Sequence, residues 1–182
     1  MKLNDILKEA DDDTNHAMRF QKEVFNGTYR CSHSQLKTIA DQYIPFYING
    51  NFECNANYLT SLKGSPRICT SFNCSNNNLK SLEEAPSEIS GDFQCSMNEL
   101  TSLKDIHKII KKMDGKFLAY GNPIKSHVLG VLLIDGCKEL FLEMTDVTFI
   151  VNKYLPNHEG MKGVLKCQEE LFAADLDEYA QL

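Results

Sequence analysis

One short sequence pattern occurs three times between Phe52 and Leu103, and it limits the chain to a repeat fold. The pattern is Phe-x-Cys-x-x-Asn-x-Leu-x-x-Leu, and its copies begin at Phe52, Phe72 and Phe93, in steps of 20 and 21 residues. Repeats of this length are typical of solenoids, in which each repeat buries its apolar face only against stacked neighbours. The sequence therefore predicts a stack of similar coils.

Further copies appear on both sides of the central three when the residue types are relaxed. One spans Tyr29–Ile39, another spans Phe117–Ile124, and a degraded turn places Leu140 and Leu142 where the aromatic residue and the cysteine stood. We therefore expect five to six coils. Each of the five clearer copies also has an apolar residue four positions ahead of its aromatic residue: Phe25, Ile48, Ile68, Ile89 and Met113.

The spacing within the pattern predicts which side chains face the core. The aromatic residue and the cysteine are two positions apart, so in a strand both point inward while the residue between them points outward. The asparagine amide can donate and accept hydrogen bonds, so Asn57, Asn77 and Asn98 are expected to bind the backbone of their own and the next coil. Inward cysteines are expected to stack as small apolar groups: Cys31, Cys54, Cys74 and Cys95.

The pattern resembles the leucine-rich repeat, L-x-x-L-x-L-x-x-N-x-L, with Phe and Cys in its second and third leucine positions. The match covers about residues 25–142, but the first leucine position lies four residues ahead instead of three. The resemblance implies an α/β solenoid, a leucine-rich-repeat-like array of five to six coils with a parallel sheet on the concave face. This short array, with its Phe-x-Cys and Leu-Thr-Ser-Leu motifs, also resembles leucine-rich-repeat proteins encoded by bacteriophages.

We divide the 182 residues into three parts. Apolar residues at helical spacing predict a short N-terminal helical cap over 1–27, the array covers 28–143, and a two-helix C-terminal cap covers 144–182. Thr145 is expected to cap the first C-terminal helix, which ends near Pro156.

Composition excludes several kinds of partner. Residues 28–142 hold 12 basic and 11 acidic residues without a basic stripe, and the whole chain has a net charge of −6, so we expect no nucleic-acid partner. No run of 18 apolar residues and no secretory leader is present, so we expect a soluble cytoplasmic protein with no membrane partner. The seven cysteines lack paired C-x-x-C spacing, so free thiols are expected instead of disulfides or a metal site.

The outward positions of the coils predict the binding surface. A solenoid presents one continuous sheet face, and its last coils here turn apolar and aromatic with charges around them, as at a protein interface. We therefore expect a non-enzymatic protein-binding module. Under the phage resemblance, its partner is a host factor, inhibited in the host cytoplasm, such as a defence-related protein. The expected site residues are Leu118, Tyr120, Phe141, Lys116, Glu139, Glu143, Arg30, Glu53, Asp92 and Gln94.

Several alternatives stay open at the level of sequence. Leu118, Tyr120 and Phe141 could instead be core residues covered by the C-terminal cap. The chain could be a cysteine-dependent enzyme, with Cys137 or Cys167 paired with a histidine that is distant in sequence. It could also be a self-assembling structural protein. Its oligomeric state is open between a monomer and a homodimer through the C-terminal cap. No phosphate-binding loop or other cofactor motif is present, so we expect no cofactor.

Overall fold

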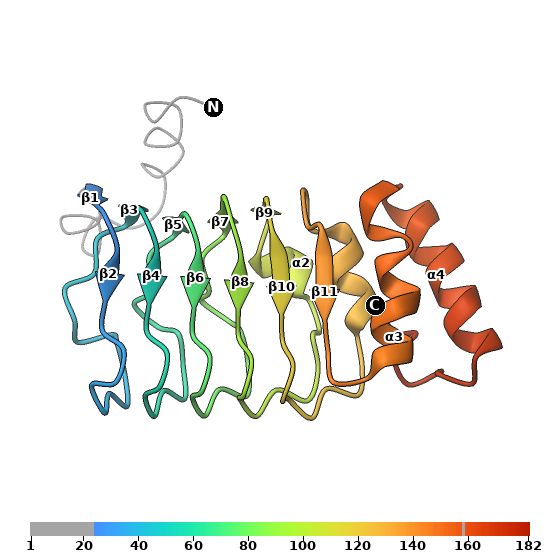
Figure 1. Cartoon of the computed structure of the whole chain (residues 1–182), viewed down its shortest axis with the longest axis horizontal. Helices are drawn as coiled ribbons and strands as arrows, with labels where there is room; N and C mark the ends of the chain where they lie inside the picture. Colours follow the sequence, from blue (N-terminus) through green and yellow to red (C-terminus); the bar gives the residue numbers. More distant parts are fainter. Residues whose placement is uncertain (1–23, 158) are drawn as a thin grey trace.

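The computed structural model describes residues 24–157 and 159–182, and within them the chain winds into a β-solenoid followed by helices (Figure 1). Each of the first five coils contributes one short strand to each of two parallel sheets, and the sixth contributes a strand to only one of them. The helices predicted near the N-terminus fall on residues 1–23, outside the described residues, so they stay a prediction.

The front sheet contains the repeated pattern and faces the viewer in Figure 1. Its strand order is β2-β4-β6-β8-β10-β11, and all neighbours are parallel and paired in register. Leu140 pairs with Phe117, which confirms the degraded sixth turn. The strands are β2 (Tyr29–Arg30), β4 (Phe52–Glu53), β6 (Phe72–Asn73), β8 (Phe93–Gln94), β10 (Lys116–Leu118) and β11 (Glu139–Phe141).

A second parallel sheet, which the sequence analysis did not predict, is formed by the residues just ahead of each aromatic position. Its order is β1-β3-β5-β7-β9. At the corner between the two sheets, successive coils approach closely: a Cβ on Gly50 would lie 2.2 Å from the carbonyl oxygen of Gly27. The strands are β1 (Val24–Asn26), β3 (Tyr47–Asn49), β5 (Ile68–Cys69), β7 (Glu88–Ile89) and β9 (Lys112–Met113).

The register of the second sheet places Cys69 in the inward row of apolar residues, although Ile68 beside it is buried as well. Cys69 pairs with Ile89, whereas Ile68 pairs with Glu88, so Cys69 and not Ile68 continues the inward row. Only Thr70 and Ser71 separate Cys69 from Phe72, whereas three residues separate Ile48 from Phe52 and Ile89 from Phe93. This shorter corner moves the inward residue one position closer to the aromatic residue.

The core of the array is a column of stacked rings, as the spacing predicted. Consecutive ring centroids from Tyr29 to Phe117 lie 5.1–5.6 Å apart with interplanar angles of 11–25°. The four phenylalanine side chains of this column are fully buried, and so are Cys54, Cys74 and Cys95. Aromatic stacking in this geometry adds stability beyond burial alone.

The predicted asparagine column also forms, although its hydrogen bonds reach the preceding coil and not the next one. Asn57, Asn77, Asn98 and Asn122 are all buried. In each, the side-chain NH₂ donates to carbonyl groups of its own and the preceding coil, and the side-chain oxygen accepts from a backbone N–H of the preceding coil. The turns therefore satisfy backbone groups that burial would otherwise leave unpaired.

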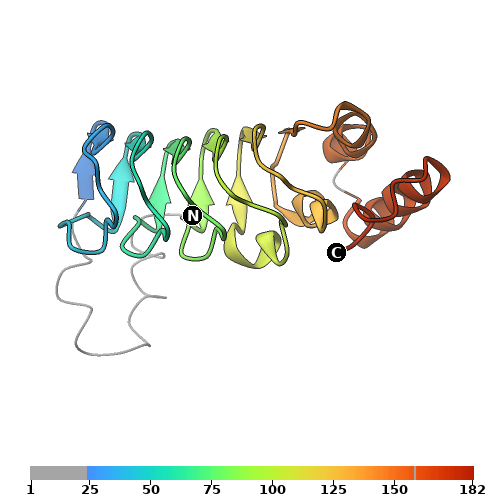
Figure 2. The same cartoon turned by 90° about the horizontal axis from the view of Figure 1, so that it is seen from below.

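Two helices close the C-terminal end of the array (Figure 2). Asn152 accepts from the Leu140 N–H at 2.8 Å and donates to the Leu140 carbonyl at 2.9 Å, so its amide replaces the next strand. Thr145 is the first residue of its helix and not the cap, because Met144 takes the capping position. The helical segments are α2 (Ile106–Ile109), η2 (Val128–Leu133), α3 (Thr145–Asn152), η3 (Leu155–Asn157) and α4 (Met161–Ala173).

Candidate protein-binding face

The outward face of the front sheet changes character along the array. The row at its centre, read through the strand register, is Arg30, Glu53, Asn73, Gln94, Leu118 and Phe141. Polar residues occupy it as far as β8, and large apolar residues occupy it on β10 and β11. Leu118 and Phe141 are direct neighbours on paired strands.

A methionine that the sequence analysis missed extends this apolar region. Met97 has a left-handed backbone (φ 55°) and an exposed side chain (54%). Its N–H donates to the Tyr120 carbonyl at 2.9 Å, so the two residues are neighbours in the ladder. A Cβ on Gly121 would lie 2.8 Å from the Met97 sulfur, so this glycine leaves room for the thioether.

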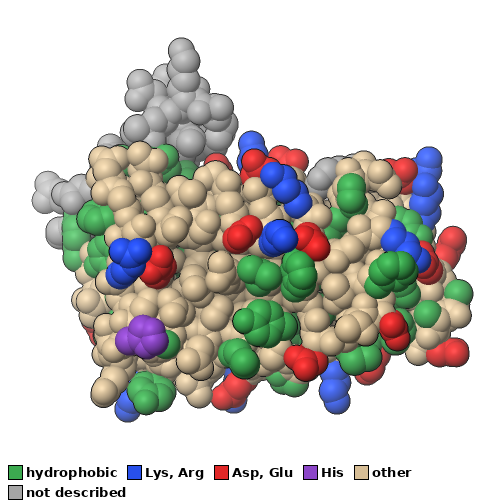
Figure 3. Space-filling view, viewed as in Figure 1, with side chains coloured by type: hydrophobic (Ala, Val, Ile, Leu, Met, Phe, Trp, Pro, Cys, Tyr) green, Lys and Arg blue, Asp and Glu red, His purple; other side chains and the backbone are tan. Residues whose placement is uncertain are grey.

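We call Met97, Leu118, Tyr120 and Phe141 the apolar patch. Figure 3 shows hydrophobic side chains gathered near the middle of this face, below a row of alternating acidic and basic groups. Tyr120 is 48% exposed, and Leu118 and Phe141 are half-buried. The C-terminal cap therefore does not bury these side chains in the core.

Charged side chains are fixed around the patch. The Lys116 ammonium lies 3.0 Å from the Glu139 carboxylate and 5.3 Å from the centroid of the Phe141 ring. The Asp92 carboxylate accepts from the Lys116 N–H at 2.8 Å, and the Glu143 carboxylate accepts from the Gly121 N–H at 3.1 Å. These contacts restrain the rim side chains before any partner arrives, which lowers the entropy cost of binding.

The predicted site residues form two separate groups. Gln94, paired in register with Leu118, and the rim residues lie beside the patch. Arg30 and Glu53 instead pair with each other at 2.8 Å near the other end of the sheet. The patch begins at Met97 in the coil of β8, which lies two strand steps from β4 and three from β2, or roughly 10 and 14 Å at the usual strand spacing, so this ion pair is not part of the apolar patch.

The thiols named for a possible enzyme are buried and protonated. All seven cysteines are free, as predicted. Burial raises the pKa of both Cys137 and Cys167 to about 12. At neutral pH these side chains are therefore in the thiol form, which is the weak nucleophile. His127 contacts the hydroxyl groups of Ser102 and Ser126, each at 2.9 Å, rather than either thiol.

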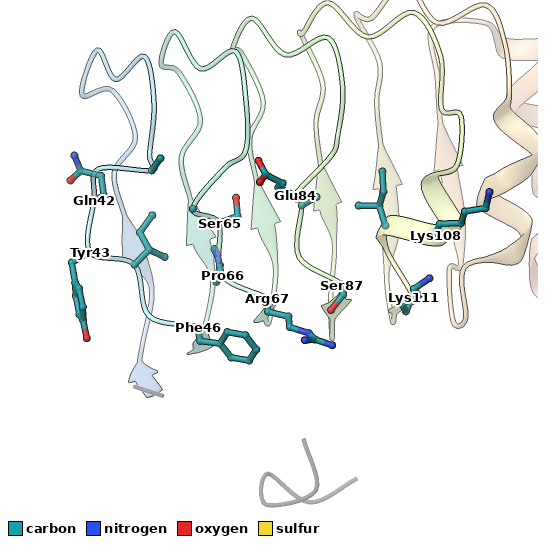
Figure 4. Close-up of a pocket in the computed structure, with 15 residues that line it drawn as sticks. Gln42, Tyr43, Phe46, Ser65, Pro66, Arg67, Glu84, Ser87, Lys108 and Lys111 are labelled. Atoms are coloured by element: carbon teal, nitrogen blue, oxygen red, sulfur yellow. The ribbon is translucent and has the colours of Figure 1, made fainter. Parts of the chain in front are cut away.

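A groove of about 620 Å³ crosses the returns of several coils (Figure 4). Arg67 lies over the Phe46 ring at 5.7 Å, and Lys108 pairs with Asp105 at 2.7 Å. Of the charged side chains labelled in Figure 4, Lys108 and Lys111 extend the same way, whereas Arg67 and Glu84 extend in other directions. Their polar groups do not converge on one point, so the groove has no defined ligand position.

Other kinds of site find no support in residues 24–157 and 159–182. No group of three or more His, Cys, Asp or Glu side chains there could hold a metal ion. None of the helices described is both long and apolar enough to cross a bilayer. Comparison with known proteins finds no family model, curated protein or solved structure that matches the chain. The apolar patch is therefore interpreted from its own chemistry.

Proposed function

We propose that this protein is a non-enzymatic binding module that captures another protein through the apolar patch. The observation that carries the proposal is the placement of four large apolar side chains at outward positions, where the solenoid core does not need them. Fixed charges surround them, as in an interface with an apolar centre and a polar rim. Contiguous exposed apolar groups of this kind mark interaction sites.

The backbone beneath the patch supports this function because it is held on both sides. The Cys95 and Met97 N–H groups donate to the carbonyls of Leu118 and Tyr120 at 2.8 and 2.9 Å, and the Ala119 N–H donates to the Phe141 carbonyl at 2.9 Å. The stacked coils therefore present the patch on a rigid surface. Binding needs little reordering of the chain, so more of the contact energy contributes to affinity.

The resemblance of the repeats supports a more specific proposal about source and partner. The chain is a leucine-rich-repeat-like protein encoded by a bacteriophage, and its partner is a host protein, such as a defence factor, that it inhibits. Free thiols are compatible with the reducing host cytoplasm that this role requires. The proposed phage origin and host partner rest only on the resemblance of the Phe-x-Cys and Leu-Thr-Ser-Leu motifs.

The test is affinity capture from bacterial lysate followed by mass spectrometry, with wild-type protein and two variants as bait. Phe141→Ala removes the aromatic centre of the patch, and a hot-spot truncation costs about 2 kcal/mol or more of affinity. Asn73→Ala is the matched control, because Asn73 occupies the same outward row on β6.

We expect one protein to be enriched by wild type and by Asn73→Ala and lost with Phe141→Ala. Thermal melting of both baits must show that they are folded. If the same protein is enriched equally by all three baits, the apolar patch is not the binding site.

A further inference from the structure

Helix α4 has an exposed apolar stripe that no described part of the chain covers. Met161, Leu165 and Phe172 are 51%, 55% and 49% exposed. They occupy positions i, i+4 and i+11, which fall on one side of a helix. A second side of α4, roughly 100° around the helix from the stripe, packs on η2 and α3 through Val164, Cys167 and Leu171.

The charges along α4 run against its own dipole. The helix has no acidic residue in its first turn and no basic residue in its last. Instead Lys162 and Lys166 lie in its first half, and Glu169 and Glu170 lie in its second half. A helix dipole favours the reverse order, with acidic groups first. This arrangement is unfavourable within one helix but favourable beside a second helix that runs in the opposite direction.

Two of these four charges have partners within the chain. Lys166 pairs with Glu159 at 2.7 Å, and Glu170 pairs with Lys153 and accepts from the Tyr154 hydroxyl at 2.8 Å. Among the described residues no ion pair involves Lys162 or Glu169, and both lie beside the apolar stripe on the helix face.

We propose that α4 binds α4 of a second copy of this chain, antiparallel, about a two-fold axis near Leu165 and Lys166. Lys162 and Glu169 lie three or four residues on either side of that point, so each faces its opposite charge across the axis. Met161 faces the partner subunit's Phe172, and Leu165 packs at the centre. A two-fold interface must be self-complementary in this way, and α4 meets that requirement in both charge and apolar content.

The size of the contact sets the expected strength. One helix pair buries less than the roughly 1,200 Å² of an ordinary specific interface, so we expect a weak, reversible dimer. The apolar patch lies on the front sheet and remains free, so dimerisation and partner capture are separate events. A dimer would present two patches and would increase the avidity for a multivalent partner.

Sedimentation velocity of the full chain tests the proposal, at concentrations from about 5 to 500 μM, which span the affinities expected of a small interface. Wild type should shift from monomer to dimer across this range. Leu165→Glu places two carboxylates at the axis and should remove the dimer. Its fold is checked by circular dichroism and thermal melting, which should match wild type because Leu165 is more than half exposed.

Charge exchange provides the sharper test. Lys162→Glu or Glu169→Lys alone places like charges opposite each other at two points and should weaken the dimer about tenfold. The double variant Lys162→Glu/Glu169→Lys restores both pairs and should return the dissociation constant to near the wild-type value. Glu83→Lys, on an exposed return of the array, is the control and should leave dimerisation unchanged.

Three outcomes would overturn the proposal: a wild-type monomer at every concentration, a dimer that Leu165→Glu does not weaken, or a double variant no better than the single ones. None of these outcomes bears on the apolar patch, because Phe141→Ala alters capture without touching α4.

Discussion

Asn77 joins two coils: its side-chain NH₂ donates to the Cys54 carbonyl of the preceding coil at 3.1 Å and to the Cys74 carbonyl of its own coil at 3.0 Å. Its side-chain oxygen accepts from the Leu59 N–H at 3.0 Å. Asn77→Ala leaves these buried groups unpaired, so we expect the free energy of unfolding to fall by about 1–3 kcal/mol in urea titrations.

Asn78 provides the matched control for this prediction. It is exposed, and its side chain donates only to the Glu99 carboxylate at 3.3 Å. Asn78→Ala should change stability by less than about 0.5 kcal/mol. Equal losses from the two substitutions would show that the asparagine column does not support the stack.

The asparagine column could be predicted from the sequence because its signal is periodic, whereas other features depend on geometry that the repeat does not record. The second sheet was missed because its strands do not carry the Phe-x-Cys pattern: apart from one apolar position in each coil, their residues differ from coil to coil. Cys69 was not identified as part of the inward row, because the length of the corner before Phe72 is visible only once both strands are known.

The candidate site was predictable only in part for the same reason. Leu118, Tyr120 and Phe141 follow from strand alternation, which the repeat fixes. Met97 precedes the asparagine, and its exposure depends on a left-handed backbone (φ 55°). The sequence could have revealed Met97 as a large apolar residue at the position where other coils have His33, Ala56, Asn76 and Gly121.

The edge of the front sheet provides a second stability prediction. Asn152 exchanges hydrogen bonds with both backbone groups of Leu140, in place of a further strand. Asn152→Ala should lower the free energy of unfolding by about 1–3 kcal/mol, because both backbone groups become unpaired beneath α3. Asn157→Ala, at an exposed position in η3, should be near neutral. A neutral Asn152→Ala would mean that water replaces the amide at this edge.

The buried thiols predict a loss of stability in alkali. Burial raises the pKa of Cys69 to about 12, whereas an unfolded cysteine has a pKa of about 8.5. The folded state therefore holds the proton that the unfolded state releases. The stability from this difference is complete below about pH 8.5 and falls as the pH rises toward the folded value, by about 1.4 kcal/mol per pH unit for each such thiol.

Cys69→Ala should therefore make the decline of unfolding free energy between about pH 9 and 10.5 shallower by about 1 kcal/mol per pH unit. Urea titrations with reductant at several pH values measure that slope. Ile89→Val, a truncation of the neighbouring core residue, should lower the whole curve without changing its slope. Parallel curves for wild type and Cys69→Ala would contradict the buried, protonated thiol.

Met97 should show a conflict between stability and binding. A left-handed backbone costs about 1–2 kcal/mol for most side chains, and asparagine tolerates it better. Asn76 occupies the equivalent position one coil earlier with φ 57°. Met97→Asn should therefore stabilise the protein by about 0.5–1 kcal/mol. The same substitution removes an exposed apolar group of the patch, so it should weaken capture of the partner.

Ala56→Asn separates the two effects, because Ala56 has the same backbone conformation (φ 54°) two coils before Met97 and lies away from the patch. Like Met97→Asn, it should raise the melting temperature, but it should leave capture of the partner unchanged. If Met97→Asn stabilises the protein and binds the partner as well as wild type does, Met97 lies outside the interface. If Met97→Asn destabilises the protein, the packing of Met97 on Gly121 and Tyr120 outweighs the backbone strain. Met97 then contributes to folding and not to recognition of the partner.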